Sequence, residues 1–300
     1  MKMAKINFKN LRPVEVSDRE RFDKALATMQ SQSCEACFPN IFMYREPYGI
    51  EFLETGKRIV VYERVARAIH YPLGKVTDPE ELYAISKAFQ DEGLTDGGIY
   101  DVPEAFLDDY PDCDQLFDLE YDEGMIDYLF SIEKVATFTG PKLRKKHNLV
   151  KQFQASWPYA EVQKINADNI HIAAKLAYEL NSRMEQCEFL EEEALALKAG
   201  WENFEELGLQ GILLFAEPNY PAGLSVYSML HSDTVDVHFE KADHAVKGAS
   251  QTLTWQLAVA LRGKAKFMNR EQDMNEGNLR HAKRSLDPER FFKRYFLRNL

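Results

Sequence analysis

The chain has 300 residues, of which 45% are hydrophobic and 12% aromatic, and its 37 basic and 48 acidic residues give a formal net charge of −11. This composition excludes a disordered chain, and the length suits two domains of about 150 residues. The negative balance argues against a general nucleic-acid-binding surface, so we expect no DNA ligand. No apolar run approaches the roughly 20 residues of a membrane span, and the N-terminus has no signal-peptide core. We therefore expect a cytoplasmic protein without stable membrane insertion.

The charges are unevenly distributed along the chain. Residues 91–127 contain no Lys or Arg, whereas residues 142–151 and 262–298 are locally basic. A protein with separated charges can hold a polyanionic ligand in one basic groove while repelling it elsewhere. A polyanionic partner therefore remains compatible with the acidic balance, and the acidic stretch itself predicts only a solvated surface.

Four cysteines make no paired metal-binding pattern. Cys34 and Cys37 form a lone C-x-x-C, while Cys113 and Cys187 stand apart. With no second pair and no preceding strand, this motif favours ordinary, partly buried thiols over a zinc or redox site. No metal is expected.

The first half of the chain alternates strand and helix signals. The expected elements are a strand at 6–14, a helix from Ser17 or Asp18 to Gln30, strands at 50–53, 58–62 and 66–71, a helix at 79–89, a strand at 97–102, a short helix at 103–110, and strands at 116–121 and 125–130. This order is typical of a mixed α/β fold. The adjacent Gly140 and Pro141 form the clearest break, so we expect domains at 1–140 and 141–300.

The second half begins with a helix and then builds a sheet. The expected elements are a helix at 142–155, a strand at 160–165, helices at 168–186 and 191–207, strands at 211–217, 224–230 and 234–240, a helix at 248–262, a short strand at Phe267 and Met268, and a helix at 275–284. Helices, a three-stranded meander, a helix, a strand and a final helix again predict a mostly antiparallel sheet flanked by helices.

Strand 234–240 carries the first candidate chemistry. Residues of a strand alternate between two faces, so Asp236, His238 and Glu240 share one face. Two acids and an imidazole on one face can form a general-base site, and we take His238 and Glu240 as catalytic candidates. A solvated sheet face explains the same pattern, and both interpretations remain open.

The run from Lys266 to Pro288 is unusually polar for a turn between a strand and a helix. Asn269, Arg270, Glu271, Gln272 and Asp273 follow one another, although a simple reversal would use Gly, Pro or a single Asn. On the following helix, Glu276, Arg280, Lys283 and Arg284 are spaced to share a face. The run predicts either a salt-bridged, solvated helix or a site for an anionic or polar acyl donor.

The helix at 142–155 has a basic side that includes Arg144, Lys145 and Lys146. Such a helix is either an amphipathic connector with a solvated basic face or a wall that meets the phosphates of a nucleotide, coenzyme A or tRNA end. Motifs for serine hydrolases, P-loop proteins and zinc proteases are absent from the sequence.

These segments resemble a known family. Asn269 to Asp273, Leu279-Arg280, Lys283, Ser285 and Pro288 match the C-terminal signature of a group similar to the C-terminal domain of phosphatidylglycerol lysyltransferase. Glu240 to Asp243, Gly248-Ala249 and Leu143 to Phe153 also fit. The resemblance spans most of the chain and implies two tandem acyltransferase folds of the GNAT type. Fem-type transferases, which take amino acids from charged tRNA, share this arrangement.

The resemblance implies a transferase that moves an acyl or aminoacyl group to an amine or hydroxyl acceptor in a cleft between the two halves. Glu240 or Asp273 would be the base or the anchor of the acceptor amine, with His238 beside them. The residues expected to hold the donor are Arg270, Glu271, Arg280, Lys283 and Lys241, flanked by Arg144, Lys145 and Lys146. The acceptor would be a small molecule or a peptide.

The loop before Gly248 bears on the donor. GNAT proteins that use coenzyme A cradle its pyrophosphate at this junction, usually through Gln/Arg-x-x-Gly-x-Gly/Ala. Here the candidates to bind the anion of a cofactor are Lys247, Gly248 and Ala249. The junction keeps one glycine and lacks the leading Gln or Arg, but its anion-binding geometry is expected to remain. This departure favours charged tRNA over an acyl-CoA as co-substrate, and no cofactor is certain. A non-catalytic module that binds an anion or a protein, and a CoA-dependent N-acetyltransferase, remain alternatives.

Overall fold

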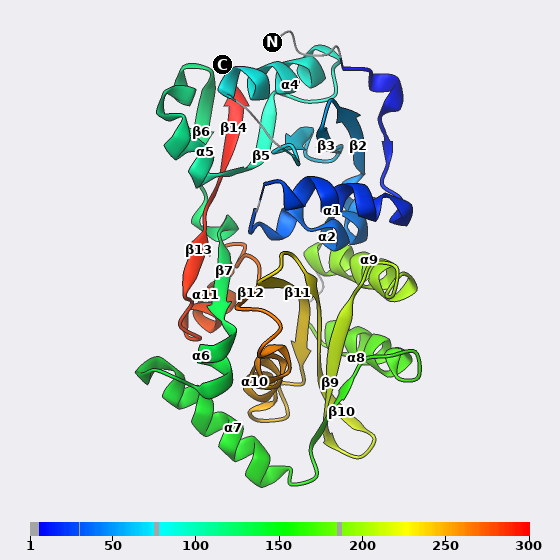
Figure 1. Ribbon diagram of the computed structural model, residues 1–300. Coiled ribbons are helices and arrows are strands. Elements are labelled where there is room, and N and C mark those ends of the chain that lie inside the picture. The colour runs from blue at the N-terminus through cyan, green and yellow to red at the C-terminus, as the bar shows by residue number, and fades with distance from the viewer. Residues whose placement is uncertain (1–5, 30, 75–77, 185–187) are drawn as a thin grey trace. The chain divides into compact units, whose positions relative to one another are not determined.

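The computed structural model describes residues 6–29, 31–74, 78–184 and 188–300. The chain forms two compact units, and the first combines Met1–Ile126 with Phe292–Leu300, while the second is Asp127–Phe291 (Figure 1). In the described part of the chain, no helix has the length and apolar character needed to cross a bilayer.

The first unit is built on a seven-stranded sheet in the order β1-β2-β3-β4-β5-β14-β6. Its strands are β1 (Arg12–Pro13), β2 (Ile50–Thr55), β3 (Arg58–Glu63), β4 (Ala68–His70), β5 (Gly98–Pro103), β6 (Phe117–Glu120) and β14 (Arg294–Asn299). Neighbouring strands are antiparallel except β4 and β5, which run parallel. Its helices are α1 (Arg19–Ala27), α2 (Phe38–Met43), α3 (Arg45–Tyr48), α4 (Pro79–Asp91) and α5 (Glu104–Asp109).

Helix α4 covers the core of this sheet. Asp78 caps it by accepting a hydrogen bond from the backbone N–H of Glu81, and Pro79 fits the first turn because it has no N–H to leave unpaired. Leu82, Ile85 and Phe89 recur at helical spacing and are fully buried against the sheet. The sequence pattern thus predicts both this helix and its buried face.

The second unit repeats the layout. Its seven-stranded sheet has the order β13-β7-β12-β11-β10-β9-β8. The strands are β7 (Asp127–Ser131), β8 (Glu161–Lys164), β9 (Gln210–Glu217), β10 (Tyr220–Met229), β11 (Thr234–Ala242), β12 (Phe267–Asn269) and β13 (Arg290–Phe292). Strands β11 and β12 are parallel, as β4 and β5 are in the first unit. The ladders β7–β12, β10–β11, β9–β10 and β8–β9 are antiparallel.

Helices cover both faces of this second sheet (Figure 1). They are α6 (Ile132–Thr137), α7 (Arg144–Ser156), α8 (Ile170–Ser182), α9 (Glu188–Glu202), α10 (Ala249–Leu261) and α11 (Gly277–Arg284). The neighbouring residues Glu240 and Lys241 point to opposite faces, because Glu240 meets Thr254 on α10 while Lys241 meets Glu193 on α9. Helix α10 therefore lies on the Glu240 face, and α9 lies on the other.

Each sheet receives one strand from a distant part of the chain. Strand β7 follows β6 of the first unit in sequence and pairs with β12 of the second sheet. Strand β14 follows β13 of the second sheet and lies between β5 and β6 of the first. The two halves thus exchange equivalent strands through the chain connections at residues 126–127 and 291–292.

Most expected elements are present, with three informative differences. The strand expected at 6–14 is only β1, because Asn7 caps a short 3-10 helix at Phe8–Asn10 through its side chain. Strands β13 and β14 were not expected. The boundary expected near residue 140 falls between α6 and the 3-10 helix at Pro141–Leu143, inside the second unit. The expected helix ends at Gln30 and Gln186, and also Cys187, lie outside the described residues; Cys34, Cys37 and Cys113 are buried thiols.

Candidate functional site

The parallel strands β11 and β12 separate soon after they meet. Their pairing covers Thr234–Asp236 against Phe267–Asn269, while β11 continues to Ala242. Two parallel strands that diverge open a gap at their carboxyl ends, and ligands of α/β proteins commonly bind beyond such ends. The candidate site in the second unit is therefore built from the residues after Asp236 on β11 and after Asn269 on β12.

Glu240 lies on β11 beyond this divergence, and only one of its two carboxylate oxygens accepts hydrogen bonds from the described residues. Its Oε1 accepts hydrogen bonds from Arg270 Nη2 at 2.5 Å and from Thr254 Oγ1 at 2.7 Å. Its Oε2 is buried, and no described residue donates a hydrogen bond to it. A buried carboxylate oxygen without a donor is costly, so this atom is suited to receive a proton or an N–H group from a ligand.

One cation contacts this carboxylate, and a second cation lies within electrostatic reach of the first. Arg270 follows β12, and its guanidinium lies 5.7 Å from the centre of the Phe130 ring. Burial of Lys146 on α7, together with the charge of Arg270, lowers the pKa of the Lys146 ammonium. Since Glu240 balances only one of the two positive charges, the group formed by Glu240, Arg270 and Lys146 has a surplus charge that suits an anion or a developing oxyanion.

Asp273 has a different environment, although it was predicted beside Glu240 as a possible base. It is fully buried, and both its oxygens are occupied: Arg280 donates two hydrogen bonds at 2.8 and 2.9 Å, Tyr128 Oη donates one at 2.6 Å, and Asn275 N–H another at 3.0 Å. Burial alone would raise the pKa of Asp273, but these donors outweigh it and lower the pKa. The geometry suits Asp273 to anchor the turn rather than to accept a proton.

Lys283 also stabilises the turn after β12. It is buried, and its Nζ donates to the backbone carbonyls of Arg270, at 2.6 Å, and Gln272. The turn contains left-handed backbone at Glu271, with φ of 56°, a conformation that costs energy in residues other than glycine. Lys283, with Arg280 on the same helix, therefore holds the backbone that presents Arg270.

His238 is the extra residue of a β-bulge, since Tyr227 pairs with Val237 and Val226 with Phe239. Its Nε2 lies 2.9 Å from Ser228 Oγ, and its Nδ1 lies 3.6 Å from Asp236 and 3.7 Å from Glu271. Asp236 and His238 therefore lie together, close to Glu271. The bulge reverses the alternation after Val237, so Glu240 points to the opposite face of the sheet, and the expectation that all three residues share one face is wrong. The side chain of His238 is fully buried, which suits support of the strand better than contact with a substrate.

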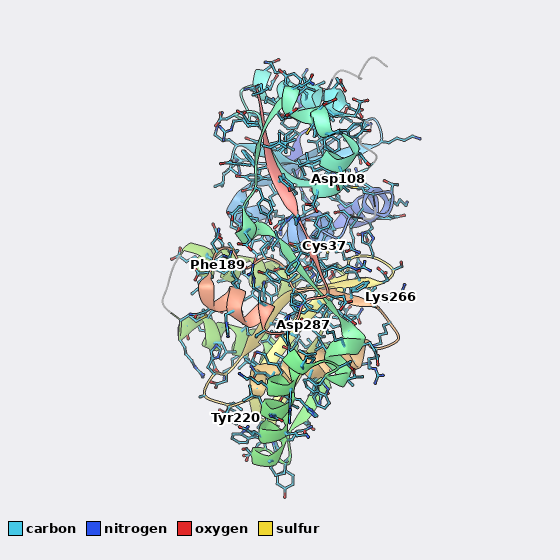
Figure 2. The ribbon with its side chains drawn as sticks, turned by 90° about the vertical axis from the view of Figure 1, so that its left-hand side faces the viewer. Cys37, Asp108, Phe189, Tyr220, Lys266 and Asp287 are labelled. Atoms are coloured by element: carbon cyan, nitrogen blue, oxygen red, sulfur yellow. The ribbon has the colours of Figure 1, made fainter. Side chains whose placement is uncertain are left out.

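Lys241 does not join this group. Its Nζ forms an ion pair with Glu193 of α9 at 2.7 Å, on the face opposite Glu240. Arg144 and Lys145 are exposed on α7, whereas Lys146 of the same helix is half-buried, and its pKa is lowered by burial and by the charge of Arg270. Near the start of α7, Lys142 pairs at 2.9 Å with Asp287, which is labelled in Figure 2. Of Arg144, Lys145 and Lys146, the structure links only Lys146 to the candidate site, through the charge of Arg270.

The start of α10 is closely packed. Gly248 has φ of +84°, and a Cβ placed there would lie 2.6 Å from the carbonyl oxygen of Leu149 on α7. In the preceding loop, the Asp243 carboxylate accepts a hydrogen bond from Ala245 N–H at 2.9 Å. It also forms an ion pair with Arg183. Lys247 is exposed and Ala249 is buried. A helix start covered by another backbone and preceded by an acid is poorly suited to a pyrophosphate.

Comparison with known families decides the classification. The profile described as "Phosphatidylglycerol lysyltransferase, C-terminal" matches residues 26–298. The chain belongs to this family. No curated protein matches the sequence. The family resemblance expected from the sequence is thus confirmed.

Solved structures confirm the fold of this family member. A conserved protein of unknown function from Bacteroides thetaiotaomicron has a TM-score of 0.87 at 24% identity, covering 97% of this chain and 99% of its own. FemX matches with a TM-score of 0.65 at 8% sequence identity, and the match covers 97% of both chains. The C-terminal domain of a candidate lysylphosphatidylglycerol synthetase from Agrobacterium fabrum matches with a TM-score of 0.63 at 12% sequence identity. This match covers 94% of the present chain and 91% of the other. Two tandem GNAT-like halves, each a mostly antiparallel sheet flanked by helices, describe the chain.

Two residues of the site in this phosphatidylglycerol lysyltransferase-like chain were missed from the sequence. Thr254 donates to Glu240, and Tyr128 donates to Asp273 across 145 positions of sequence. Thr254 is a polar residue on the buried side of an amphipathic helix, and that misfit is a signal that points to a polar partner. Tyr128 carries no comparable signal, because aromatic residues are common in strands.

Proposed function

We propose that the protein is an aminoacyl or acyl transferase whose reaction takes place at Glu240, Arg270 and Lys146 in the second unit. One observation carries the proposal: Glu240 has a buried oxygen to which no described residue donates a hydrogen bond, while its other oxygen accepts from Arg270, whose charge also acts on Lys146. Membership of the phosphatidylglycerol lysyltransferase C-terminal family supports group transfer as the reaction class. A cytoplasmic location belongs to the same proposal.

The proposed reaction is direct attack of an acceptor amine on the ester carbonyl of the donor. Glu240 Oε2 takes the proton from the attacking nitrogen, and Arg270 and Lys146 stabilise the negative charge that develops on the carbonyl oxygen. The C–N bond forms as the C–O bond of the ester breaks, and Glu240 passes the proton that it took from the amine to the departing oxygen, which leaves as a hydroxyl group. No covalent enzyme intermediate is needed, because the site has only to orient both reactants.

Aminoacyl-tRNA is the proposed donor. The covered start of α10 and the acid at Asp243 favour it over an acyl-CoA, and the family resemblance points the same way. The acceptor would be a small molecule or peptide with a free amine. A CoA-dependent acetyl transfer is the competing chemistry, and ligand binding separates the two.

The first test is a thermal-shift titration of the full chain with acetyl-CoA, charged tRNA and uncharged tRNA. A ligand that binds only the folded state raises the Tm as its concentration passes its Kd. We expect a saturable rise with charged tRNA. A rise with acetyl-CoA alone would overturn the proposed donor, and no rise with either ligand would favour a non-catalytic binding module.

The second test measures transfer of a radiolabelled amino acid from charged tRNA to hydroxylamine as a model amine. We expect Glu240→Gln to reduce the rate by about 100-fold or more, as loss of a general base does. Lys146→Ala should reduce it as well, while the neighbouring exposed Lys145→Ala should not. Equal rates in the Lys145 and Lys146 variants, or an active Glu240→Gln enzyme, would contradict the assigned site.

A further inference from the structure

A large groove lies between α8 and α9 in the second unit, away from the candidate transfer site. Its volume is about 600 Å³, within the range of about 300–1,000 Å³ typical of small-molecule sites. The two helices pack side by side (Figure 1). The groove exists because the helices carry small side chains where they face it, namely Ala174, Ala177 and Ala194, above a floor of Leu190 and Leu197.

Two aromatic side chains line the groove. Tyr178 is 75% exposed, so its ring is accessible to a ligand in the groove. Trp201 is half-buried and stacks on Phe204 with their ring centres 6.0 Å apart. Both rings line the same space as the alanines. The faces of Tyr and Trp rings carry partial negative charge and attract cations.

The charged side chains that line the groove also favour a cation. Glu191, Glu202 and Lys198 line it. Lys198 lies 4.0 Å from Glu202, and both side chains are well exposed, so this pair is nearly self-compensated and weak. Within the described chain, Glu191 forms no ion pair, so it leaves the groove with one uncompensated negative charge. An anionic ligand would meet repulsion here, and a neutral one would leave Glu191 unused.

We propose that this groove binds an organic cation with an apolar body, such as an alkylammonium. The aliphatic part would lie on the leucine and alanine floor, and the ammonium would meet the ring faces and Glu191. The groove is independent of Glu240 and Arg270, because α9 covers the opposite face of the sheet. The proposal therefore stands or falls without reference to the transfer reaction.

The test is isothermal titration of the full chain with hexyltrimethylammonium, hexanoate and 1-hexanol, three probes with the same apolar tail. We expect saturable binding of the ammonium and none of hexanoate at equal concentration. Tyr178→Ala should weaken the ammonium by about 3- to 30-fold, the loss expected for one cation–π contact. Glu191→Gln should weaken it too, and Ala194→Trp should abolish binding by filling the groove.

Tyr159→Ala is the matched control, since Tyr159 is also 75% exposed but does not line the groove. It should bind the ammonium as the unmodified protein does. Equal binding of hexanoate, equal weakening by Tyr159→Ala, or failure of the ammonium to bind would overturn the proposal. A concentration-dependent dimer in light scattering that Ala194→Trp disrupts would also overturn it, by making a second copy of the chain the occupant.

Discussion

Asp273 and Arg280 show how the position of a carboxylate decides its role. Both residues lie in the polar run that the sequence singles out, and spacing correctly brings Arg280 and Lys283 to one side of the same helix. Spacing does not show that Asp273 is fully buried with four donors around it, because Tyr128 comes from another strand far away in sequence. Residue types were predictable here, whereas their partners depended on long-range contacts.

We predict that Asp273→Asn lowers the free energy of unfolding by about 2–4 kcal/mol, since it leaves Arg280 without its buried counter-charge. The pKa of Asp273 is lowered from 3.8 in the folded state. Its contribution is therefore present above pH 3.8 and is lost as the pH falls through the lower folded value. Chemical denaturation at pH 7 and in the acid range measures both effects. Glu20→Gln is the control, because its pair with Lys24 is exposed, and it should change stability very little.

His70 in the first unit gives an opposite pH dependence. Its Nδ1 lies 2.7 Å from Asp101 and its Nε2 lies 3.3 Å from Glu63, while Arg294 also donates to Asp101 at 2.6 Å. Burial alone would lower the pKa of His70, but Asp101 and Glu63 outweigh it and raise the pKa to about 10. The charged imidazole therefore stabilises the fold fully below pH 6.5, and this contribution is lost as the pH rises towards 10.

We predict that His70→Gln lowers stability at pH 6 by about 1–3 kcal/mol, the usual cost of losing hydrogen bonds to charged groups. The same variant should remove much of the decline in stability between pH 6.5 and 10. Denaturant titrations at several pH values measure both quantities. A variant that keeps the full alkaline decline would show that another group causes it.

The start of α10 distinguishes packing from ligand binding. Gly248 and Gly263 both have left-handed backbone, with φ of +84° and +75°, but only Gly248 has close neighbours. The sequence predicts a glycine that cradles an anion, and it cannot show that the backbone of α7 occupies the space. The strand alternation and the helical periodicity of the same region were sufficient to predict β11 and α10 themselves.

We predict that Gly263→Ala lowers stability by about 1 kcal/mol, the cost of the backbone conformation alone. Gly248→Ala should cost about 2–4 kcal/mol, because its Cβ would also collide with Leu149. Thermal unfolding of the two variants measures the difference. Equal losses would mean that α7 moves aside easily, which would reopen the start of α10 to an anion.

Strand β14 was missed for a physical reason. Its burial pattern from Arg294 to Asn299 does not alternate, since Arg294 and Leu297 are buried and Arg298 is exposed. It also pairs on both sides with strands that lie some 180 residues or more earlier. Local patterns identify a strand by its alternation, and this strand depends instead on partners that only the complete fold supplies.

The exchange of strands leads to a prediction about fragments. Residues 127–291 contain the second sheet except for Phe292, the last residue of its edge strand β13, whereas residues 1–126 lack β14 from the middle of the first sheet. We expect the fragment 127–291 to show cooperative unfolding and protected amides in hydrogen exchange. The fragment 1–126 should show little protection, and adding a synthetic peptide of residues 292–300 should increase it. Cooperative folding of 1–126 alone would contradict the importance of β14.

The same exchange sets the order of events during synthesis. The ribosome completes β5 and β6 early, but the strand that fills the place between them follows only after the whole second sheet. At roughly 5–20 residues per second, about 10–35 s pass between the end of β6 and the arrival of β14. During this interval two strand edges of the nascent chain lack their partner and are open to wrong pairing. A chain with this topology is therefore expected to rely on chaperones in proportion to how slowly it is translated.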